Sequence, residues 1–498
     1  MIRTDWTERH ARYTPNAPAL VWAPTGRIYT YADLHEQGER LAHQLQKRFN
    51  LSPGDRIGIL AENSIEHVQL FVAAQKAGFV LVPLNYRLTA SELQYLVDDS
   101  TPSVLFVADD HAETAQSLDT LAHLLPLEAV ETSIQSAPEN ASAPDGAPTL
   151  DDPLMILYTS GTTGRPKGAI ISHGMLFWNA VNTEMRLDLT SADRSFNAAP
   201  FYHTGGWNVL LTPFLLHGAT THLYPDFDAD TLLRDCDAEA FTILWGVPTM
   251  LKLMSDSTVF DEVTLDTIRY AIVGGEAMPE PLIRTWQDKG VPIRQGFGMT
   301  EVGVNCFSLP ARDALHKIGS IGFPNFYIDT KVVDDDGTEV PPNTPGELLM
   351  RGPVVTPGYW RNEEATAEAI DADGWFHTGD LVEVDDEGYF FVVGRKKEMY
   401  ISGGENVYPA EIEAVLYEHD GVDEAAVIGV PDAQWGEVGA AFVSGTQLDA
   451  EVLRTHCTTH LARYKVPKYI EIRDVLPKGH SGKIQKSALR EQFSAHAS

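Results

Sequence analysis

One segment of the chain combines residue types that could hold a polyphosphate. It reads YTSGTTGRPKG from Tyr158 to Gly168 and contains three glycines, four Ser or Thr residues and Lys167. Backbone N–H groups, hydroxyl groups and an ammonium group all donate to phosphate oxygens. The segment is not a Walker A loop, because Pro166 stands where that pattern requires its second glycine. A flexible polar loop would have a similar composition, so the interpretation depends on what else the sequence contains.

Five further segments carry residues suited to nucleotide and carboxylate chemistry. In chain order they are FYHTGG (201–206), GFGMTE (296–301), TGD (378–380), GRKK (394–397) and SGKI (481–484). Together with the first loop, and in this order, they resemble the motifs of the adenylate-forming superfamily. That superfamily comprises acyl-CoA synthetases, luciferases and carrier-loading adenylation domains. The resemblance covers nearly the whole chain.

The resemblance implies a ligase that joins a carboxylic acid to the α-phosphate of ATP, releases pyrophosphate and passes the acyl group to CoA. Negative charge develops on phosphoryl oxygens, so positioned cations and hydrogen-bond donors would supply most of the catalysis. The residues implied to act in catalysis are Lys167, His203, Glu301 and Lys483. Those implied to bind ATP or AMP are Thr159, Ser160, Gly161, Thr162, Thr163, Gly164, Lys167, Gly275, Glu276, Phe297, Gly298, Thr300, Asp380, Arg395 and Lys483. Mg²⁺ would be held by Glu301 and Thr159, whose oxygen atoms suit a hard cation.

The resemblance also implies sites for CoA and for the acid. The residues that would bind CoA are Gly403, Gly404, Trp435, Lys468 and Arg87. Val466 departs from the pattern, because some relatives carry a further phosphate-binding Arg there. The residues that would line the acid pocket are His203, Trp207, Val247, Gly274, Gly298 and Met299. They are mostly apolar, which suits a medium- or long-chain fatty acid or an aryl acid. Lys397 would be the hinge about which the small domain rotates between half-reactions.

Two other functions are compatible with the same motifs. An adenylating enzyme could load a carrier protein in place of CoA, which Trp435 and Lys468 disfavour. A non-catalytic nucleotide sensor could share the fold, but the chain retains every charged residue that the chemistry needs.

The charge distribution bears on the same ligands. The formal net charge is −33, which argues against general binding to nucleic acid or to an anionic membrane. Residues 454–490 nevertheless hold nine basic and two acidic side chains, a local charge of +7. Such a basic island would attract a polyanion such as ATP or CoA. The acidity fits a salt-rich source, but ordinary acidic proteins share it.

The elements that position these residues are predicted from the apolar pattern. Residues 1–300 alternate short apolar runs with amphipathic ones, which is typical of βαβ units. The first expected elements are a strand at 57–60, a helix at 64–77 ending at Gly78, and strands at 79–82 and 103–108. A connecting loop is expected at 132–150, followed by a second doubly wound unit with strands near 153–158, 195–200, 221–224, 241–247, 269–273 and 293–297.

The pattern changes after residue 315. Short alternating strands with turns at Asp336-Gly337, Pro345-Gly346, Asp373-Gly374 and Glu387-Gly388 predict antiparallel sheet. Beyond Gly394, helices are expected at 409–417 and 449–462, with strands at 422–430, 438–444 and 468–472. We therefore expect an α/β fold with a large N-terminal domain (1–394) of two doubly wound subdomains plus a small β-barrel-like subdomain. A small, mobile α+β C-terminal domain (395–498) would follow.

The remaining composition limits location and partners. Cys236, Cys306 and Cys457 are odd in number and form no CxxC pair, which speaks against a disulfide framework and suits a reducing cytoplasm. Residues 1–15 lack the apolar core of a signal peptide, and no apolar run is long enough to span a membrane. The expected partners are the acid, ATP, Mg²⁺ and CoA, without nucleic acid; the sequence leaves a homodimer open.

Overall fold

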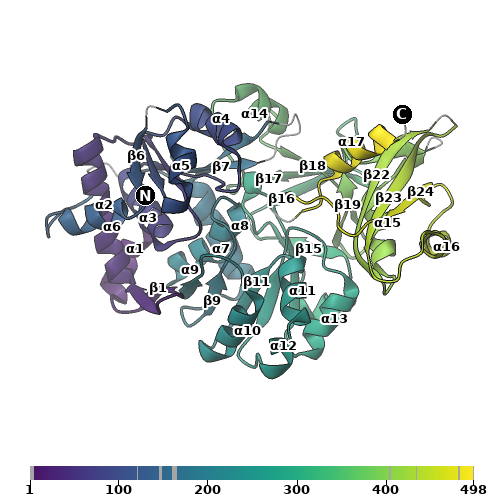
Figure 1. Cartoon of the computed structure of the whole chain (residues 1–498), viewed down its shortest axis with the longest axis horizontal. Helices are drawn as coiled ribbons and strands as arrows, with labels where there is room; N and C mark the ends of the chain where they lie inside the picture. Colours follow the sequence, from purple (N-terminus) through teal and green to yellow (C-terminus); the bar gives the residue numbers. More distant parts are fainter. Residues whose placement is uncertain are drawn as a thin grey trace. The chain divides into compact units, whose positions relative to one another are not determined.

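The computed structural model describes residues 5–120, 122–144, 148–159, 165–402, 405–432, 434–479 and 483–496. The chain divides into two compact units (Figure 1). The first comprises Met1–Thr330 and Met350–His377, and the second comprises Lys331–Leu349 and Thr378–Ser498. The domain boundary expected after residue 394 lies within the second unit.

The first unit contains a six-stranded sheet in the order β6-β5-β3-β4-β7-β8. Its strands are β3 (Arg56–Leu60), β4 (Val80–Pro83), β5 (Val104–Val107), β6 (His123–Pro126), β7 (Pro153–Thr159) and β8 (Lys167–Ser172). All neighbours are parallel except β7 and β8, which form a hairpin. Helix α3 (Ile65–Ala77) connects β3 to β4 and ends at Gly78, whose φ of +73° suits glycine. The early strands and this helix are confirmed.

Two expectations about this sheet are wrong. The strand at 153–159 belongs to the first sheet, since Met155 pairs with Leu81 of β4, and not to a second doubly wound unit. The loop expected at 132–150 begins as helix, because α6 (Ala129–Ser136) buries Val130 and Ile134. These two apolar side chains, four residues apart, lie on one helical face.

The rest of the first unit is built on two further runs of strands. One has the order β2-β1-β10-β9, with β1 (Pro18–Trp22), β2 (Arg27–Thr30), β9 (Arg194–Asn197) and β10 (Thr220–Leu223). The other has the order β11-β12-β13-β14-β15, with β11 (Ile243–Gly246), β12 (Tyr270–Val273), β13 (Ile293–Phe297), β14 (Phe307–Ser308) and β15 (Ser320–Pro324). β11, β12 and β13 are parallel, so their carboxyl ends lie at one edge. In an α/β sheet that edge is where ligands bind.

Apolar burial between helices and sheets stabilises this unit. Helix α2 (Tyr31–Phe49) begins with a capping box between Thr30 and Asp33 and packs Leu34, Leu41 and Leu45 into the core. α3 is buried on nearly all sides, so it shows no amphipathic stripe. Other helices of the unit include α4 (Ala90–Ser100), α7 (His173–Leu187), α8 (Thr204–Asn208), α11 (Pro248–Asp256) and α14 (Glu363–Ala369).

The second unit contains antiparallel strands and a small α+β portion. Strands in the order β19-β18-β17-β16 lie wholly or mostly in this unit; they are β16 (Asp329–Val333), β17 (Gly346–Arg351), β18 (Phe376–Val384) and β19 (Phe390–Arg395). The second sheet runs β21-β20-β23-β22, with β24 beside β23. Its elements are β20 (Tyr400–Ser402), β21 (Glu405–Val407), β22 (Val422–Asp432), β23 (Gly436–Gly445), β24 (Tyr469–Ile472), α15 (Pro409–Tyr417), α16 (Ala450–His460) and α17 (Lys486–His496). The expected strands and the first two helices are confirmed, whereas α17 was not predicted.

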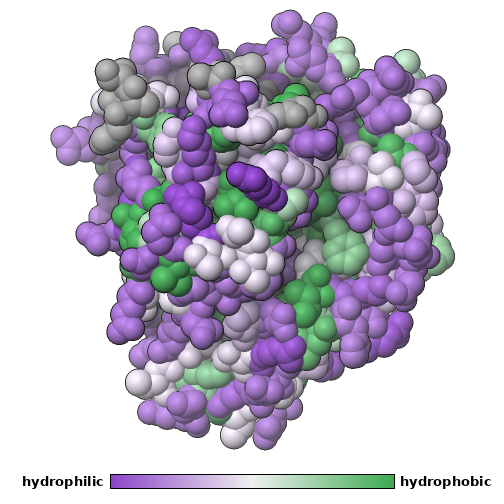
Figure 2. All heavy atoms as spheres, turned by 90° about the vertical axis from the view of Figure 1, so that its right-hand side faces the viewer, coloured by the Kyte–Doolittle hydropathy of each residue, from purple (hydrophilic) through white to green (hydrophobic). Residues whose placement is uncertain are grey.

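One face of the molecule is mostly hydrophilic. Hydrophilic side chains make up most of the face in Figure 2, and hydrophobic ones form smaller groups between them. Among the described residues, no helix has the length and apolar content needed to cross a membrane. All three cysteines are free and buried.

Candidate active site

The β7–β8 hairpin holds the two ends of the predicted phosphate loop. Thr159 is the last residue of β7 and pairs with Lys167, the first residue of β8. The Thr159 hydroxyl lies 3.4 Å from the Lys167 carbonyl oxygen. Ser160, Gly161, Thr162, Thr163 and Gly164 lie outside the described residues. The hairpin therefore places a hydroxyl and an ammonium group on either side of the loop, as a phosphate site requires.

Glu301 is brought to the same place from a distant part of the sequence. A short 3₁₀ turn, Thr300–Val302, follows β13 and presents this carboxylate. The Thr159 hydroxyl donates to Glu301 Oε1 at 3.2 Å. Glu301 is only 9 % exposed. The two residues expected to hold Mg²⁺ thus lie side by side, and their oxygen donors fit that ion.

Tyr359 belongs to this cluster and was not predicted from the sequence. Its hydroxyl donates to Glu301 Oε1 at 3.0 Å, and Lys167 Nζ lies 5.3 Å from its ring centre. Burial, with Glu301 alongside, raises the pKa of Tyr359 above its usual range, so that the hydroxyl keeps its proton. The only sequence signal was the run Gly358-Tyr359-Trp360, an aromatic pair after a glycine, which matches no chemical pattern by itself.

The residues expected at the acid and adenine sites lie at the carboxyl ends of β11, β12 and β13. Val247 follows β11, Gly274, Gly275 and Glu276 follow β12, and Phe297, Gly298 and Met299 end or follow β13. Val247 Cγ1 would lie 3.3 Å from a Cβ at Gly275, so these strand ends are in contact. A Cβ at Gly298 would lie 2.1 Å from the Val304 oxygen, so only glycine fits there. The Phe297 ring packs edge-on against Phe307 at 5.7 Å.

Trp207 requires a correction. It was expected to line the acid pocket, but it is fully buried in the core of the first unit. Its indole N–H donates to the Phe201 carbonyl oxygen at 2.6 Å, and its ring packs against Phe71 and Phe201. Trp207 therefore supports the segment that carries His203. Trp245 of β11 is the tryptophan near that segment, since its ring would lie 2.9 Å from a Cβ at Gly205.

Asp380 and Arg395 form an ion pair in the second unit. They are cross-strand partners on β18 and β19, and Arg395 Nε lies 2.5 Å from Asp380 Oδ1. The Asp380 side chain is almost completely buried, and its backbone N–H donates to the Thr378 hydroxyl at 3.1 Å. A carboxylate fixed in this way can accept hydrogen bonds from two ribose hydroxyls. The adjacent TGD and GRKK motifs are thus joined by strand pairing.

The predicted hinge, Lys397, is exposed and lies between two anchored residues. On one side, Lys396 Nζ pairs with Asp335 at 2.9 Å and with Glu347 at 3.1 Å. On the other side, Glu398 pairs with Lys486 at 2.8 Å. In the described part of the chain, no hydrogen bond or ion pair holds the Lys397 side chain.

Lys486 connects the residue after the hinge to the body of the small domain. It lies at the start of α17 and also pairs with Glu413 of α15 at 2.9 Å. Burial opposes the charge of Glu398, but Lys486 outweighs it and holds the pKa of Glu398 below its usual range. Lys483, the expected catalytic lysine, is exposed three residues before Lys486.

Two of the expected CoA residues meet at one carboxylate. Lys468 forms an ion pair with Asp432, and the Trp435 backbone N–H donates to Asp432 Oδ1 at 3.0 Å. The bond from Lys468, with backbone donors of this turn, lowers the pKa of Asp432 to about 2. Trp435 is half exposed. Arg87 lies exposed in the first unit beside Tyr86; Gly403 and Gly404 lie outside the described residues.

The chain matches known proteins over its whole length. Residues 7–360 match the family model of the AMP-binding enzyme, and residues 411–483 match the AMP-binding enzyme C-terminal domain. The chain belongs to the AMP-binding enzyme family. The mixed α/β fold with a large N-terminal and a small C-terminal domain is the fold of these AMP-binding enzymes.

Three other AMP-binding enzymes illustrate the similarity. Feruloyl-CoA synthase of Amycolatopsis sp. is 42% identical, with 98% of each chain covered. Indoleacetate–CoA ligase of Aromatoleum aromaticum is 38% identical, with 99% of this chain and 98% of that protein covered. The structure of o-succinylbenzoate CoA synthetase from Bacillus subtilis in complex with ATP and magnesium ion has a TM-score of 0.86 at 30% identity, with 98% of this chain and 99% of that chain covered.

Proposed function

We propose that this AMP-binding enzyme is an ATP-dependent acid–CoA ligase. In the first half-reaction a carboxylate oxygen attacks the α-phosphorus of ATP, and the bond to the bridging oxygen breaks, releasing pyrophosphate. In the second, the CoA thiol loses its proton, its sulfur bonds to the acyl carbon and AMP leaves. The observation that carries the proposal is the meeting of Thr159, Lys167 and Glu301 at the phosphate loop.

The residues of the chain bring two anions together and neutralise the charge that develops. Lys167 would contact the β- and γ-phosphates, and Thr300 the α-phosphate. Asp380 with Arg395 would fix the ribose, and Phe297 would lie along adenine. A bound Mg²⁺, held by Glu301 and Thr159, would neutralise phosphate charge. Positioning of this kind accounts for most of the catalysis expected in phosphoryl transfer.

The acid is a fatty or an aryl acid, and we propose an aryl acid. Val247 and Met299 are apolar, and the Trp245 ring, which lies close to Gly205, would limit the depth of the proposed pocket. Two relatives are named for aryl substrates, a feruloyl-CoA synthase and an indoleacetate–CoA ligase. A planar ring would make offset or edge contacts with the indole.

A panel of acids in a pyrophosphate-exchange assay tests the proposal. We expect hydroxycinnamates or indoleacetate to give exchange at least tenfold faster, as kcat/KM, than straight-chain acids. Faster exchange with straight-chain acids would overturn the aryl preference alone. An absence of exchange with every acid, while ATP still binds, would overturn the ligase and favour a nucleotide sensor.

CoA is proposed as the acceptor because the second unit contains a cationic hollow beside Lys468. The hollow has a volume of about 530 Å³ and is lined by Arg454, Thr458, Leu461, Arg463, Val466, Pro467 and Lys468. Arg454 donates to the carbonyl oxygens of Pro467 and Lys468 at 2.6 and 3.1 Å, so its guanidinium supports the loop. Arg463 is exposed and pairs with no carboxylate among the described residues. The presence of Trp435 and Lys468 disfavours a carrier protein as the acceptor.

Arg463 is therefore expected to bind the 3′-phosphate of CoA. It would replace the phosphate-binding Arg that some relatives carry at the position of Val466. Arg463→Ala should lower kcat/KM for CoA about tenfold, because a charge-assisted hydrogen bond is worth roughly 1.5 kcal/mol or more. The same variant should use 3′-dephospho-CoA as well as the unaltered chain does. Equal losses with both thiols would contradict the assignment.

The proposal places the enzyme in the cytoplasm, which its three unpaired buried cysteines support. It requires no nucleic acid and no second copy of the chain.

A further inference from the structure

We propose that Tyr359 is a positioning residue that fixes the Glu301 carboxylate so that one of its oxygens faces a divalent cation. The inference rests on the proposed function, which gives Glu301 its cation. In this role Tyr359 acts through Glu301, to which its hydroxyl donates.

The two oxygens of Glu301 are in different surroundings. Oε1 accepts hydrogen bonds from the Tyr359 hydroxyl at 3.0 Å and the Thr159 hydroxyl at 3.2 Å. Oε2 accepts none from the residues that the structure describes. The hydrogen bonds therefore select Oε2 as the oxygen left for a ligand.

Glu301 also has no protein cation to balance its charge. It is almost buried, and within the described ranges no Lys, Arg or His side chain lies at ion-pair distance from it. Lys167, the nearby cation, lies over the Tyr359 ring at 5.3 Å. A buried carboxylate without a paired charge is costly unless a cation binds it. Two neutral hydroxyls orient the carboxylate without cancelling the charge that attracts the cation.

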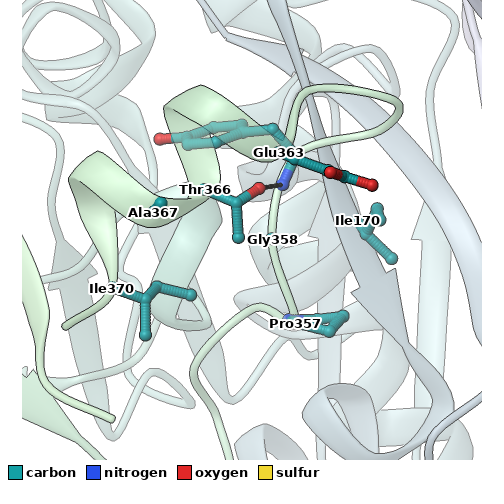
Figure 3. A pocket seen from close by; sticks show the side chains of 8 residues that line it. Ile170, Pro357, Gly358, Glu363, Thr366, Ala367 and Ile370 are labelled. Carbon is teal, nitrogen blue, oxygen red and sulfur yellow. Dashed lines mark hydrogen bonds between the residues drawn. The ribbon is translucent and has the colours of Figure 1, made fainter. Parts of the chain in front are cut away.

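A hydrogen bond at Thr366, drawn as a dashed line in Figure 3, holds the backbone of Tyr359. The Tyr359 N–H donates to the Thr366 hydroxyl of α14 at 2.9 Å. The Thr366 hydroxyl in turn donates to the Asn362 carbonyl oxygen at 2.8 Å. Gly358 approaches Thr366 so closely that a Cβ would lie 2.6 Å from its methyl carbon, and its φ of +142° suits glycine.

Residues 356–360 form a turn, and backbone hydrogen bonds attach this turn to β8, the strand that carries Lys167. The Trp360 N–H donates to the Gly168 carbonyl oxygen at 2.7 Å, and the Ile170 N–H donates to that of Gly358 at 3.1 Å. The Thr356 N–H donates to the Glu301 carbonyl oxygen at 2.7 Å. Both the backbone and the side chain of Glu301 are thus fixed from the 356–360 turn. Such support of a ligand by its neighbours sets its orientation and its affinity for metal.

Tyr359→Phe tests the inference because it removes one oxygen and keeps the ring. The probe is Mn²⁺ in place of Mg²⁺, titrated into the full-length chain with a non-hydrolysable ATP analogue and followed by electron paramagnetic resonance. We expect Mn²⁺ to bind about tenfold more weakly, in the range found for lost supporting hydrogen bonds. The metal concentration that half-activates pyrophosphate exchange should rise by the same factor, with KM for the acid unchanged.

Tyr224→Phe is the matched control. The Tyr224 hydroxyl donates to the Asp235 carboxylate at 2.6 Å, a bond of the same kind in the same unit, and neither residue belongs to the candidate site. This variant should keep the Mn²⁺ affinity of the unaltered chain.

The inference and the proposed function fail in distinguishable ways. Unaltered Mn²⁺ affinity in Tyr359→Phe, or an equal loss in Tyr224→Phe, would overturn the positioning role. Tight, Tyr359-dependent Mn²⁺ binding without acid-dependent exchange would support the positioning role and overturn the ligase.

Discussion

Replacing Lys483 by alanine should lower acyl-adenylate formation by about 10²- to 10³-fold, the loss typical of a removed charge-stabilising donor. The ammonium group would lie between the incoming carboxylate and the α-phosphate, where it offsets the repulsion of two anions. A mobile point charge on a long side chain suits that role. Lys483 is exposed, so truncating it should leave the stability of the fold nearly unchanged.

The same variant should convert supplied acyl-AMP and CoA to thioester at close to the unaltered rate. The two half-reactions, measured separately by pyrophosphate exchange and by AMP release from synthetic acyl-AMP, provide the internal control. Equal losses in both would contradict a role confined to the first step. They would point instead to a general electrostatic role of the 454–490 island.

Glu301→Gln should lower adenylation by about a hundredfold or more at physiological Mg²⁺. The glutamine amide is nearly isosteric with the carboxylate. Its oxygen can still accept hydrogen bonds from the Tyr359 and Thr159 hydroxyls. It lacks the charge that binds a hard cation, and its –NH₂ group would point toward it. High Mg²⁺ should restore part of the rate, because weaker metal binding is overcome by mass action.

Glu363→Gln is the control for this change. Glu363 is an exposed carboxylate at the first turn of α14 in the same unit. Its loss removes the same formal charge and should alter adenylation less than twofold. If Glu301→Gln retained full activity at limiting Mg²⁺, the assignment of the metal to Glu301 would be wrong.

The sequence predicts the fold well where local signals agree. Residues 64–77 carry a mostly apolar run that ends at Gly78, and α3 lies there. Thr89 and Glu92 have the capping-box spacing, and the structure contains both hydrogen bonds. Local signals do not predict the sheet to which a strand belongs, because sheet membership depends on pairing between residues far apart in the sequence. The strand at 153–159 was therefore recognised as a strand but placed in the wrong sheet.

In the candidate site, too, residues within a recognisable motif could be predicted, whereas residues whose role depends on a distant contact could not. Thr159, Lys167 and Glu301 could be selected by residue type and motif, and the structure brings them together. Tyr359 could not, because a tyrosine becomes informative only through the carboxylate that its hydroxyl reaches. Trp207 was misassigned for a related reason. A tryptophan beside a substrate motif can face the pocket or the core, and the core aromatics Phe71 and Phe201 decide which.

The partly buried ion pairs of Lys486 with Glu398 and Glu413 have a mechanical consequence. They couple the residue after Lys397 to a helix that begins three residues beyond Lys483. Separating these partly buried charges would leave Lys486 and the two carboxylates without their partners, which opposes independent movement of the residue after Lys397. A change in the backbone torsions of Lys397 would therefore move residue 398, α15 and α17 together. Lys483, which lies just before α17, would move with them. How far Lys483 moves for a given change at Lys397 would thus be set by three partly buried side chains.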